Sequence, residues 1–156
     1  MRKVFTVLVV LSFLLYLCVA FRLLIFRNAA LFSQALASIG LPRYHSSYNL
    51  VPFKTIVGYV KALIDGSMNR KIPIENIVGN LLAFMPLGFY LPFLIKKMTK
   101  LKIYVISVSG LIAAVELTQY IIRVGSMDID DFILNLVGAC IGFSIFTHKP
   151  ISNMLN

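Results

Sequence analysis

Four long apolar runs constrain the fold of this chain more than any other feature. They cover residues 4–26, 73–95, 103–122 and 130–147. A helix needs about 20 mostly apolar residues to cross the roughly 30 Å hydrocarbon core of a bilayer, and each run is close to that length. The runs therefore predict an all-α, polytopic membrane protein with four transmembrane helices.

The composition excludes a water-soluble fold. Hydrophobic residues make up 59% of the 156 residues and charged residues 13%, and the mean hydropathy is +0.87. Soluble domains carry about 45–50% apolar and about 25% charged residues. The net charge of +9 comes mostly from bases outside the apolar runs, which suits anionic lipid headgroups rather than nucleic acid. We expect one membrane domain over residues 1–156, with membrane lipids and not nucleic acid as partners.

The first apolar run also resembles a signal peptide at its start. Arg2-Lys3 precedes it, and Cys18-Val19-Ala20 loosely resembles a cleavage site. However, the run continues through Phe26, which is longer than the usual apolar segment of about 7–15 residues. We expect an uncleaved first helix.

The charges of the short loops predict the orientation. Cytoplasmic loops are enriched in Lys and Arg, so the lysine-rich connection between the second and third runs is expected inside. The next connection carries Arg123 against three aspartates and is expected outside. Four helices then place both termini in the cytoplasm. The basic first loop, residues 27–72, falls outside and opposes this arrangement. The lysines and aspartates concerned are Lys96, Lys97, Lys100, Lys102, Asp128, Asp130 and Asp131.

Between Pro52 and Gly66 the first loop has the pattern of an amphipathic helix. Apolar residues recur there at helical spacing, with Lys54, Lys61 and Asp65 among them. Such a helix can lie in the membrane interface with its lysines toward phosphates, or it can pack over the mouth of the bundle. The sequence leaves both alternatives open. The apolar residues are Ile56, Val57, Tyr59, Val60, Leu63 and Ile64.

Glycines and prolines mark two of the predicted helices. Gly138 and Gly142 are four residues apart, which predicts a close-packed helix face. We expect this face inside the bundle, with an oligomer formed through it as the alternative. Pro86 and Pro92 are expected to interrupt the second helix and to kink it.

Polar residues of three helices are expected at one depth near the outer boundary. At 1.5 Å per residue, Glu116 lies roughly 10 Å below the outer end of its helix. An unpaired carboxylate at that depth costs at least a few kcal/mol, so Glu116 should face the bundle interior and have partners. The candidate site consists of Asn76, Asn80, Glu116, Gln119, Arg123, Asp128, Asp131 and Asn135.

This set has a functional and a structural interpretation. As a ligand site, Arg123 would hold a phosphate or carboxylate through two hydrogen bonds, while Glu116 and the amides bind the rest of a headgroup. As structure, buried amides join helices, and the segment from Asp128 to Asp131 caps a helix N-terminus. No metal site or cofactor is predicted, because His45 and His148 are isolated and the cysteines lie inside apolar runs.

Several short motifs occur in a fixed order between residues 49 and 145, and as a set they resemble the VanZ-like family of small bacterial membrane proteins. The motifs are Asn49-Leu50-Val51-Pro52-Phe53, Asn76-Ile77-Val78-Gly79-Asn80, Phe84-Met85-Pro86-Leu87-Gly88, Glu116-Leu117-Thr118-Gln119, and Arg123-Val124-Gly125-Ser126-Met127-Asp128-Ile129-Asp130-Asp131 followed by Asn135 and Gly138.

The resemblance implies a multi-pass plasma-membrane protein of the cell envelope that contributes to tolerance of teicoplanin-type glycopeptides. Its ligand would be a lipid-linked cell-wall precursor, a lipoglycopeptide or an anionic headgroup, held at the outer-leaflet site. The alternative is an intramembrane enzyme acting on a lipid or cell-wall precursor, with Glu116 as general base and Asp128 and Asp131 orienting water or a divalent cation. We favour binding over catalysis, and a transporter has little support because no pair of broken helices repeats.

Overall fold

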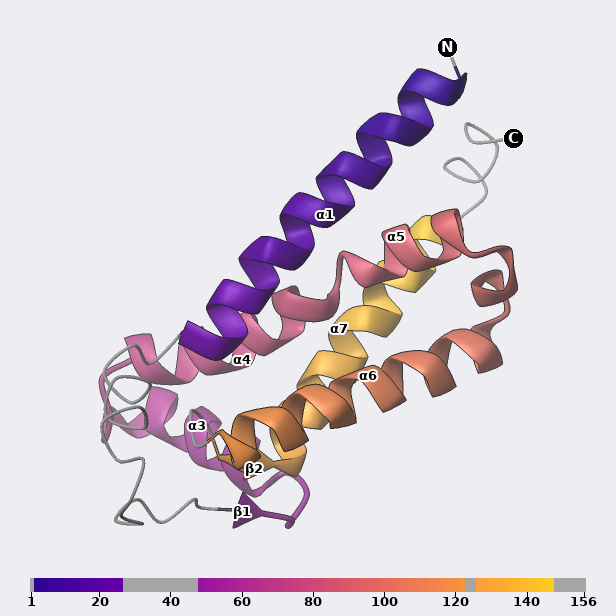
Figure 1. Cartoon of the computed structure of the whole chain (residues 1–156). Coiled ribbons are helices and arrows are strands. Elements are labelled where there is room, and N and C mark those ends of the chain that lie inside the picture. The colour runs from indigo at the N-terminus through magenta and orange to yellow at the C-terminus, as the bar shows by residue number, and fades with distance from the viewer. Residues whose placement is uncertain (1, 27–47, 123–125, 148–156) are drawn as a thin grey trace.

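The computed structural model describes residues 2–26, 48–122 and 126–147, and most of them are helical (Figure 1). Four segments are long and apolar enough to cross a membrane. They are α1 (Arg2–Phe26), α4 (Lys71–Phe84) continued by α5 (Leu87–Leu94), α6 (Leu101–Ile121) and α7 (Ile129–Thr147). Their bounds lie within two residues of the four apolar runs, so the predicted helical membrane fold is confirmed.

The shorter elements gather at the two ends of the molecule. The helix α3 (Lys54–Asp65) lies with the strands β1 (Tyr48–Asn49) and β2 (Met127–Asp128) where α6 ends and α7 begins (Figure 1). These two strands are parallel neighbours, and β1 comes from the first loop. The 3-10 helix η1 (Lys96–Thr99) joins α5 to α6 at the opposite end of the molecule, the end from which α1 starts. We call these the aspartate end, after Asp128, Asp130 and Asp131, and the lysine end, after Lys3, Lys96, Lys97, Lys100 and Lys102.

The central helix is α7, which contacts α4, α5 and α6. Two glycines allow its backbone to touch the second span. A Cβ atom on Gly138 would lie 2.0 Å from the carbonyl oxygen of Leu81, and one on Gly142 would lie 1.9 Å from that of Met85. Packing within the bundle therefore occupies this glycine face, as expected, and an oligomer through it stays an alternative prediction.

A buried stripe along α6 faces α7. Tyr104, Val108 and Ile112 are spaced four residues apart and are fully buried. The Tyr104 hydroxyl donates a hydrogen bond to the carbonyl of Ala139 at 3.0 Å, which fixes the register of the two helices. Glu116 is the next residue in the same spacing, so the helical repeat alone turns it into the bundle.

Pro86 divides the second span, because proline has no N–H for the helical ladder and its ring clashes with the preceding turn. In the last turn of α4, the Ala83 carbonyl accepts a hydrogen bond from the Tyr16 hydroxyl of α1 at 2.6 Å. Pro92 lies inside α5, which continues to Leu94. The expectation that both prolines interrupt the span is wrong for Pro92, since a membrane helix tolerates a single missing N–H without ending.

The helix α1 is attached to the second span mainly through aromatic rings. The ring centroids of Phe13 and Tyr90 lie 4.9 Å apart, and those of Phe5 and Phe93 lie 5.9 Å apart. Most of the other described side chains of α1 are exposed, including large apolar ones such as Leu15. Lipid is the natural solvent for such a surface.

The predicted amphipathic helix exists as α3, but its apolar residues form two faces rather than one. Ile56, Tyr59 and Leu63 are partly buried on the side that contacts α4 and α7. Val57 and Ile64 are exposed, and Ile64 reaches 81%. The helix therefore packs on the bundle, as one of the two alternatives predicts. It also carries an outward apolar stripe, which is the feature expected of a helix in the membrane interface.

Candidate functional site at the aspartate end

Asp130 fastens α3 to the start of α7. Its side chain is fully buried and accepts hydrogen bonds from the backbone N–H groups of Phe53, of Thr55 at 2.7 Å and of Ile56 at 3.0 Å. These N–H groups belong to the first turn of α3, where no helical partner is available. A carboxylate is a favoured acceptor there, because the N-terminal end of a helix carries partial positive charge. Asp130 therefore caps a helix from a distant part of the chain.

Asp128 completes this attachment. One of its oxygens accepts hydrogen bonds from the Asn49 amide at 3.2 Å and from the backbone N–H of Asp130 at 2.9 Å. The other accepts a hydrogen bond from the Thr55 hydroxyl at 2.6 Å. The bond to Asp130 N–H caps α7 itself, so the structural interpretation of the aspartates is correct for Asp128. We call Asn49, Thr55, Asp128 and Asp130 the fastening cluster.

Two polar pairs join three spans deeper in the bundle. The Asn80 amide of α4 donates a hydrogen bond to Asp131 of α7, and the Asn135 amide of α7 donates one to Glu116 of α6 at 3.5 Å. Asp131 and Asn135 are four residues apart and so share a face of α7. Carboxylate and amide side chains from separate spans therefore meet, as the depth count predicts for these four residues. We call Asn80, Glu116, Asp131 and Asn135 the polar pairs.

The inner part of this group is almost inaccessible. Asn135 is 1% exposed, Asn80 5% and Glu116 7%, whereas Asp131 is only partly buried. Among the residues that the structure describes, the side-chain oxygen of Asn135 is buried without a hydrogen-bond donor. An unsatisfied buried acceptor costs about 1–3 kcal/mol, so native proteins keep such atoms rare. This oxygen is therefore the point in the bundle where an added donor would gain most.

The other predicted site residues lie around the polar pairs or elsewhere. Gln119 is partly buried on α6, one turn beyond Glu116 toward the aspartate end. The Asn76 amide donates a hydrogen bond to the Ile72 carbonyl of its own helix at 2.8 Å. Asp128 belongs to the fastening cluster, and Arg123 lies outside the described residues. Ligand binding by any of the eight stays a prediction.

Sequence reasoning missed the long-range role of Asp130 and its partners. The signal that could have revealed it is the residue before α3. Phe53 has a positive φ of 65° and no side chain that can cap a helix. A helix start without Ser, Thr, Asp or Asn can be capped by an acceptor from another segment. Of the aspartates between Asp128 and Asp131, only one is needed to cap α7, so another can serve as that acceptor.

The two ends of the bundle differ in charge. The lysine end carries five exposed lysines. The aspartate end carries charges of both signs, since α3 contributes Lys54 and Lys61 there. All acidic residues of the chain lie on elements at that end: Asp65, Glu75, Glu116, Asp128, Asp130 and Asp131. In the described parts of the chain, no group of three or more His, Cys, Asp or Glu residues is placed to hold a metal ion.

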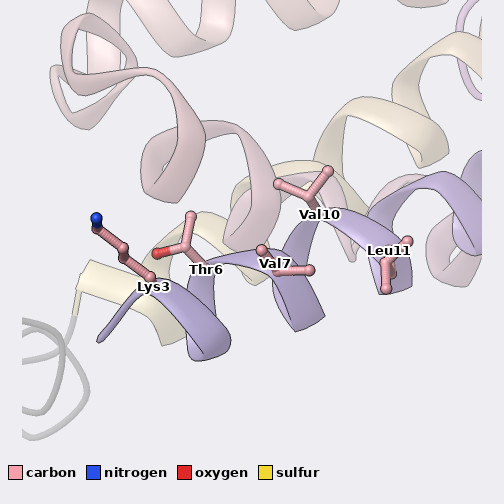
Figure 2. A pocket seen from close by; sticks show the side chains of 5 residues that line it. All are labelled: Lys3, Thr6, Val7, Val10 and Leu11. Carbon is pink, nitrogen blue, oxygen red and sulfur yellow. The ribbon is translucent and has the colours of Figure 1, made fainter. Parts of the chain in front are cut away.

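A separate open groove of about 620 Å³ runs along the first turns of α1 (Figure 2). It is lined by Lys3, Thr6, Val7, Val10 and Leu11. It lies at the lysine end and shares no residue with the polar pairs. We interpret it as part of the lipid-facing surface, because its wall is mainly apolar and belongs to one exposed helix.

Comparison with known proteins identifies a family. A family model described as VanZ/LLP1 matches residues 13–151, which include every residue of the fastening cluster and of the polar pairs. No curated protein and no solved structure matches the chain.

Proposed function

This chain belongs to the VanZ/LLP1 family, and from that premise we propose that it binds a membrane lipid or lipid-linked cell-wall precursor in the bacterial plasma membrane. The polar pairs form the core of the binding site, and the half-buried residues Asn76 and Gln119 lie on the elements leading to it. In the cell, this binding contributes to tolerance of teicoplanin-type glycopeptides.

The observation that carries the proposal is the contact between Asn135 and Glu116 together with the unpaired oxygen of Asn135. Intramembrane ionisable residues are costly and usually functional, and Glu116 is buried on a membrane-spanning helix. A purely structural pair has no reason to leave a buried acceptor without a donor. A ligand that enters from the aspartate end could donate a hydrogen bond to the Asn135 oxygen.

The charges of the two ends support an outer-leaflet location for the site. Positive residues favour the cytoplasmic side of a membrane, and the lysine end carries exposed lysines without acidic residues among its described positions. The aspartate end, with the polar pairs beneath it, then faces outward, where glycopeptides and their lipid-linked targets meet. Both termini lie in the cytoplasm in this orientation.

The test combines a cellular and a biochemical measurement. Deleting the gene should lower tolerance of teicoplanin, and wild-type protein should restore it, whereas the variant Glu116→Gln should restore it poorly. Ser144→Ala is the matched control, because Ser144 is exposed on α7 and its hydroxyl donates a hydrogen bond to the Cys140 carbonyl of its own helix. Full restoration by Glu116→Gln, or no effect of the deletion, would contradict the proposal.

The same variant separates binding from the enzyme alternative. Purified protein in lipid nanodiscs should retain lipids selectively by headgroup, and native mass spectrometry can identify them. If the wild type instead converts a polyprenyl or phospholipid substrate and Glu116→Gln does not, Glu116 is the general base of an enzyme.

A further inference from the structure

We propose that the polar pairs select a headgroup that donates hydrogen bonds and carries no net negative charge, such as the hydroxyls of a glycolipid or the ammonium group of a zwitterionic lipid. This inference rests on the proposed function, because it names the class of ligand for the same site. It differs from the sequence-based expectation of an anionic headgroup held by Arg123.

The requirement for a donor follows from the amide of Asn135. Its nitrogen donates a hydrogen bond to Glu116 at 3.5 Å, and its oxygen is the acceptor that is buried without a partner. Only a group with an O–H or N–H can satisfy this oxygen. A fully ionised phosphate or a carboxylate has acceptors alone and would leave it unsatisfied.

The neighbouring groups favour the same chemistry. Glu116 and Asp131 bring carboxylates to the two polar pairs, where they accept hydrogen bonds from the amides of Asn135 and Asn80. Both amides therefore spend a donor on a carboxylate, and the group as a whole is rich in acceptors. Hydroxyl and ammonium groups are attracted to such acceptors in a low-dielectric surrounding.

The burial of the group indicates how a headgroup reaches it. Asp131 is partly exposed at the start of α7, and Asn135 lies one turn deeper on the same face. One turn of helix is about 5.4 Å, which is the size of a sugar ring or an ethanolamine group. The site therefore suits a small donor head that enters beside Asp131 and reaches the Asn135 oxygen, with its acyl chains in the surrounding lipid.

The experiment compares four lipids with identical acyl chains, added to full-length protein in nanodiscs. Monoglucosyl diacylglycerol offers hydroxyls, phosphatidylethanolamine offers N–H donors, phosphatidylcholine carries the same phosphate without N–H donors, and phosphatidic acid is anionic. Binding is measured by native mass spectrometry and by the shift in thermal unfolding. We expect the glucosyl lipid or phosphatidylethanolamine to bind at least about tenfold more tightly than the other two, which corresponds to about 1.4 kcal/mol.

The variant Asn135→Leu tests whether the selectivity arises at this oxygen, because leucine has a similar size and no acceptor. It should remove the tenfold preference, and Ser144→Ala on the same helix should keep it. If Asn135→Leu does not fold, the wild-type preference for phosphatidylethanolamine over phosphatidylcholine still tests the need for a donor. A structure of the loaded protein should place an O–H or N–H group within hydrogen-bond distance of the Asn135 oxygen.

The outcomes separate the ligand class from the function. If phosphatidic acid binds most tightly and Asn135→Leu removes its binding, the site is real and the ligand class is wrong. If ordered water alone contacts the Asn135 oxygen and no lipid is preferred, both the ligand class and the proposed binding function fail. Preference for a donor lipid that persists in Asn135→Leu would contradict this inference and assign the selectivity to another part of the chain.

Discussion

The fastening cluster and the polar pairs both contain buried carboxylates and lie at the same end of the bundle, yet they differ in how many of their polar atoms have hydrogen-bond partners. In the fastening cluster, both oxygens of Asp130 and both oxygens of Asp128 accept hydrogen bonds. In the polar pairs, the Asn135 oxygen accepts none from the described residues, and the Asn135–Glu116 bond is long at 3.5 Å. One cluster is complete within the chain, whereas the other is not.

This difference separates structure from function more clearly than burial or charge does. A buried network in which every group has a hydrogen-bond partner holds elements in place. Removal of one member leaves the remaining buried groups without a partner. An unsaturated network costs free energy in the isolated chain and is expected where a ligand supplies what is missing. On this basis Asp128 and Asp130 fasten α3, and the polar pairs remain the candidate site.

The largest effect should follow replacement of Asp130 by alanine. Three backbone N–H groups at the start of α3 would lose a charged acceptor, which should lower the free energy of unfolding by about 3 kcal/mol or more. Thermal unfolding in detergent measures the loss, and faster tryptic cleavage after Lys61 should show that α3 has left the bundle.

Glu75→Gln is the control for Asp130→Ala. Glu75 forms an exposed ion pair with Lys71 at 3.7 Å, and such pairs contribute about 0–1 kcal/mol. If Asp130→Ala unfolds and is cleaved like Glu75→Gln, the fastening cluster does not hold α3.

A smaller effect is expected from Gly138→Ala, which acts on the packing beneath the polar pairs. The new methyl group would meet the Leu81 carbonyl at 2.0 Å, so α4 and α7 must separate. Overpacking of this kind costs about 1–3 kcal/mol. It should weaken the Asn80–Asp131 contact while leaving the cap on α3 intact, so lipid selectivity should fall without faster cleavage after Lys61.

Gly79→Ala is the matched control, because nothing lies within 4 Å of a Cβ atom at that position. Alanine there should stabilise the helix slightly, since glycine costs about 0.5–1 kcal/mol more than alanine in a helix interior. Equal unfolding temperatures for the two glycine variants would show that α7 does not need the close contact.

Asn135→Leu should change stability less than either of these. The replaced oxygen has no donor to lose, and the bond from the amide nitrogen is at the long limit of hydrogen-bond geometry. We expect the free energy of unfolding of the lipid-free protein to change by less than about 1 kcal/mol, compared with the usual 1–3 kcal/mol for breaking a buried hydrogen bond. A loss as large as that of Asp130→Ala would remove the distinction between the two clusters.

The spans and the inward direction of Glu116 could be predicted from the sequence, the spans from the length of the apolar runs and the direction from the cost of an unpaired carboxylate in the membrane. Apolar runs of membrane length fix the helices, and the spacing of Tyr104, Val108 and Ile112 carries Glu116 to the same face. The common depth of Asn80, Glu116 and Asn135 was predictable, since residue counts give depth along a helix. The pairing of Asn80 with Asp131 was not, because depth does not identify the partner of a side chain.

The fastening cluster could not be predicted in the same way. The contact between Asp130 and the start of α3 depends on tertiary placement, and neither depth nor periodicity reports which helix N-terminus a carboxylate reaches. The continuation of α5 past Pro92 likewise depends on how the surrounding helices tolerate a missing N–H. The sequence gives the number of hydrogen bonds that each group can donate or accept, whereas the tertiary fold determines its partner.

The smallest effect is expected at Asp65, because it is a solvent-exposed carboxylate that accepts its hydrogen bonds from the nearby Ser67. A hydrogen bond from the Ser67 hydroxyl, and then the Ser67 backbone N–H at 2.9 Å, lower the pKa of Asp65 below its ordinary value. A lowered pKa contributes stability above the unfolded-state pKa, and this contribution is lost as the pH falls through the folded-state pKa.

Ser67→Ala should therefore raise the Asp65 pKa in a carbon-13 NMR titration. The range of pH between the folded-state and unfolded-state pKa of Asp65, over which the stability contribution is lost, should become narrower. It should leave stability at neutral pH nearly unchanged, since exposed groups are strongly screened. Marked destabilisation by Ser67→Ala would mean that a carboxylate saturated in water matters as much as one saturated inside the bundle, and the contrast between the buried clusters would then lose its meaning.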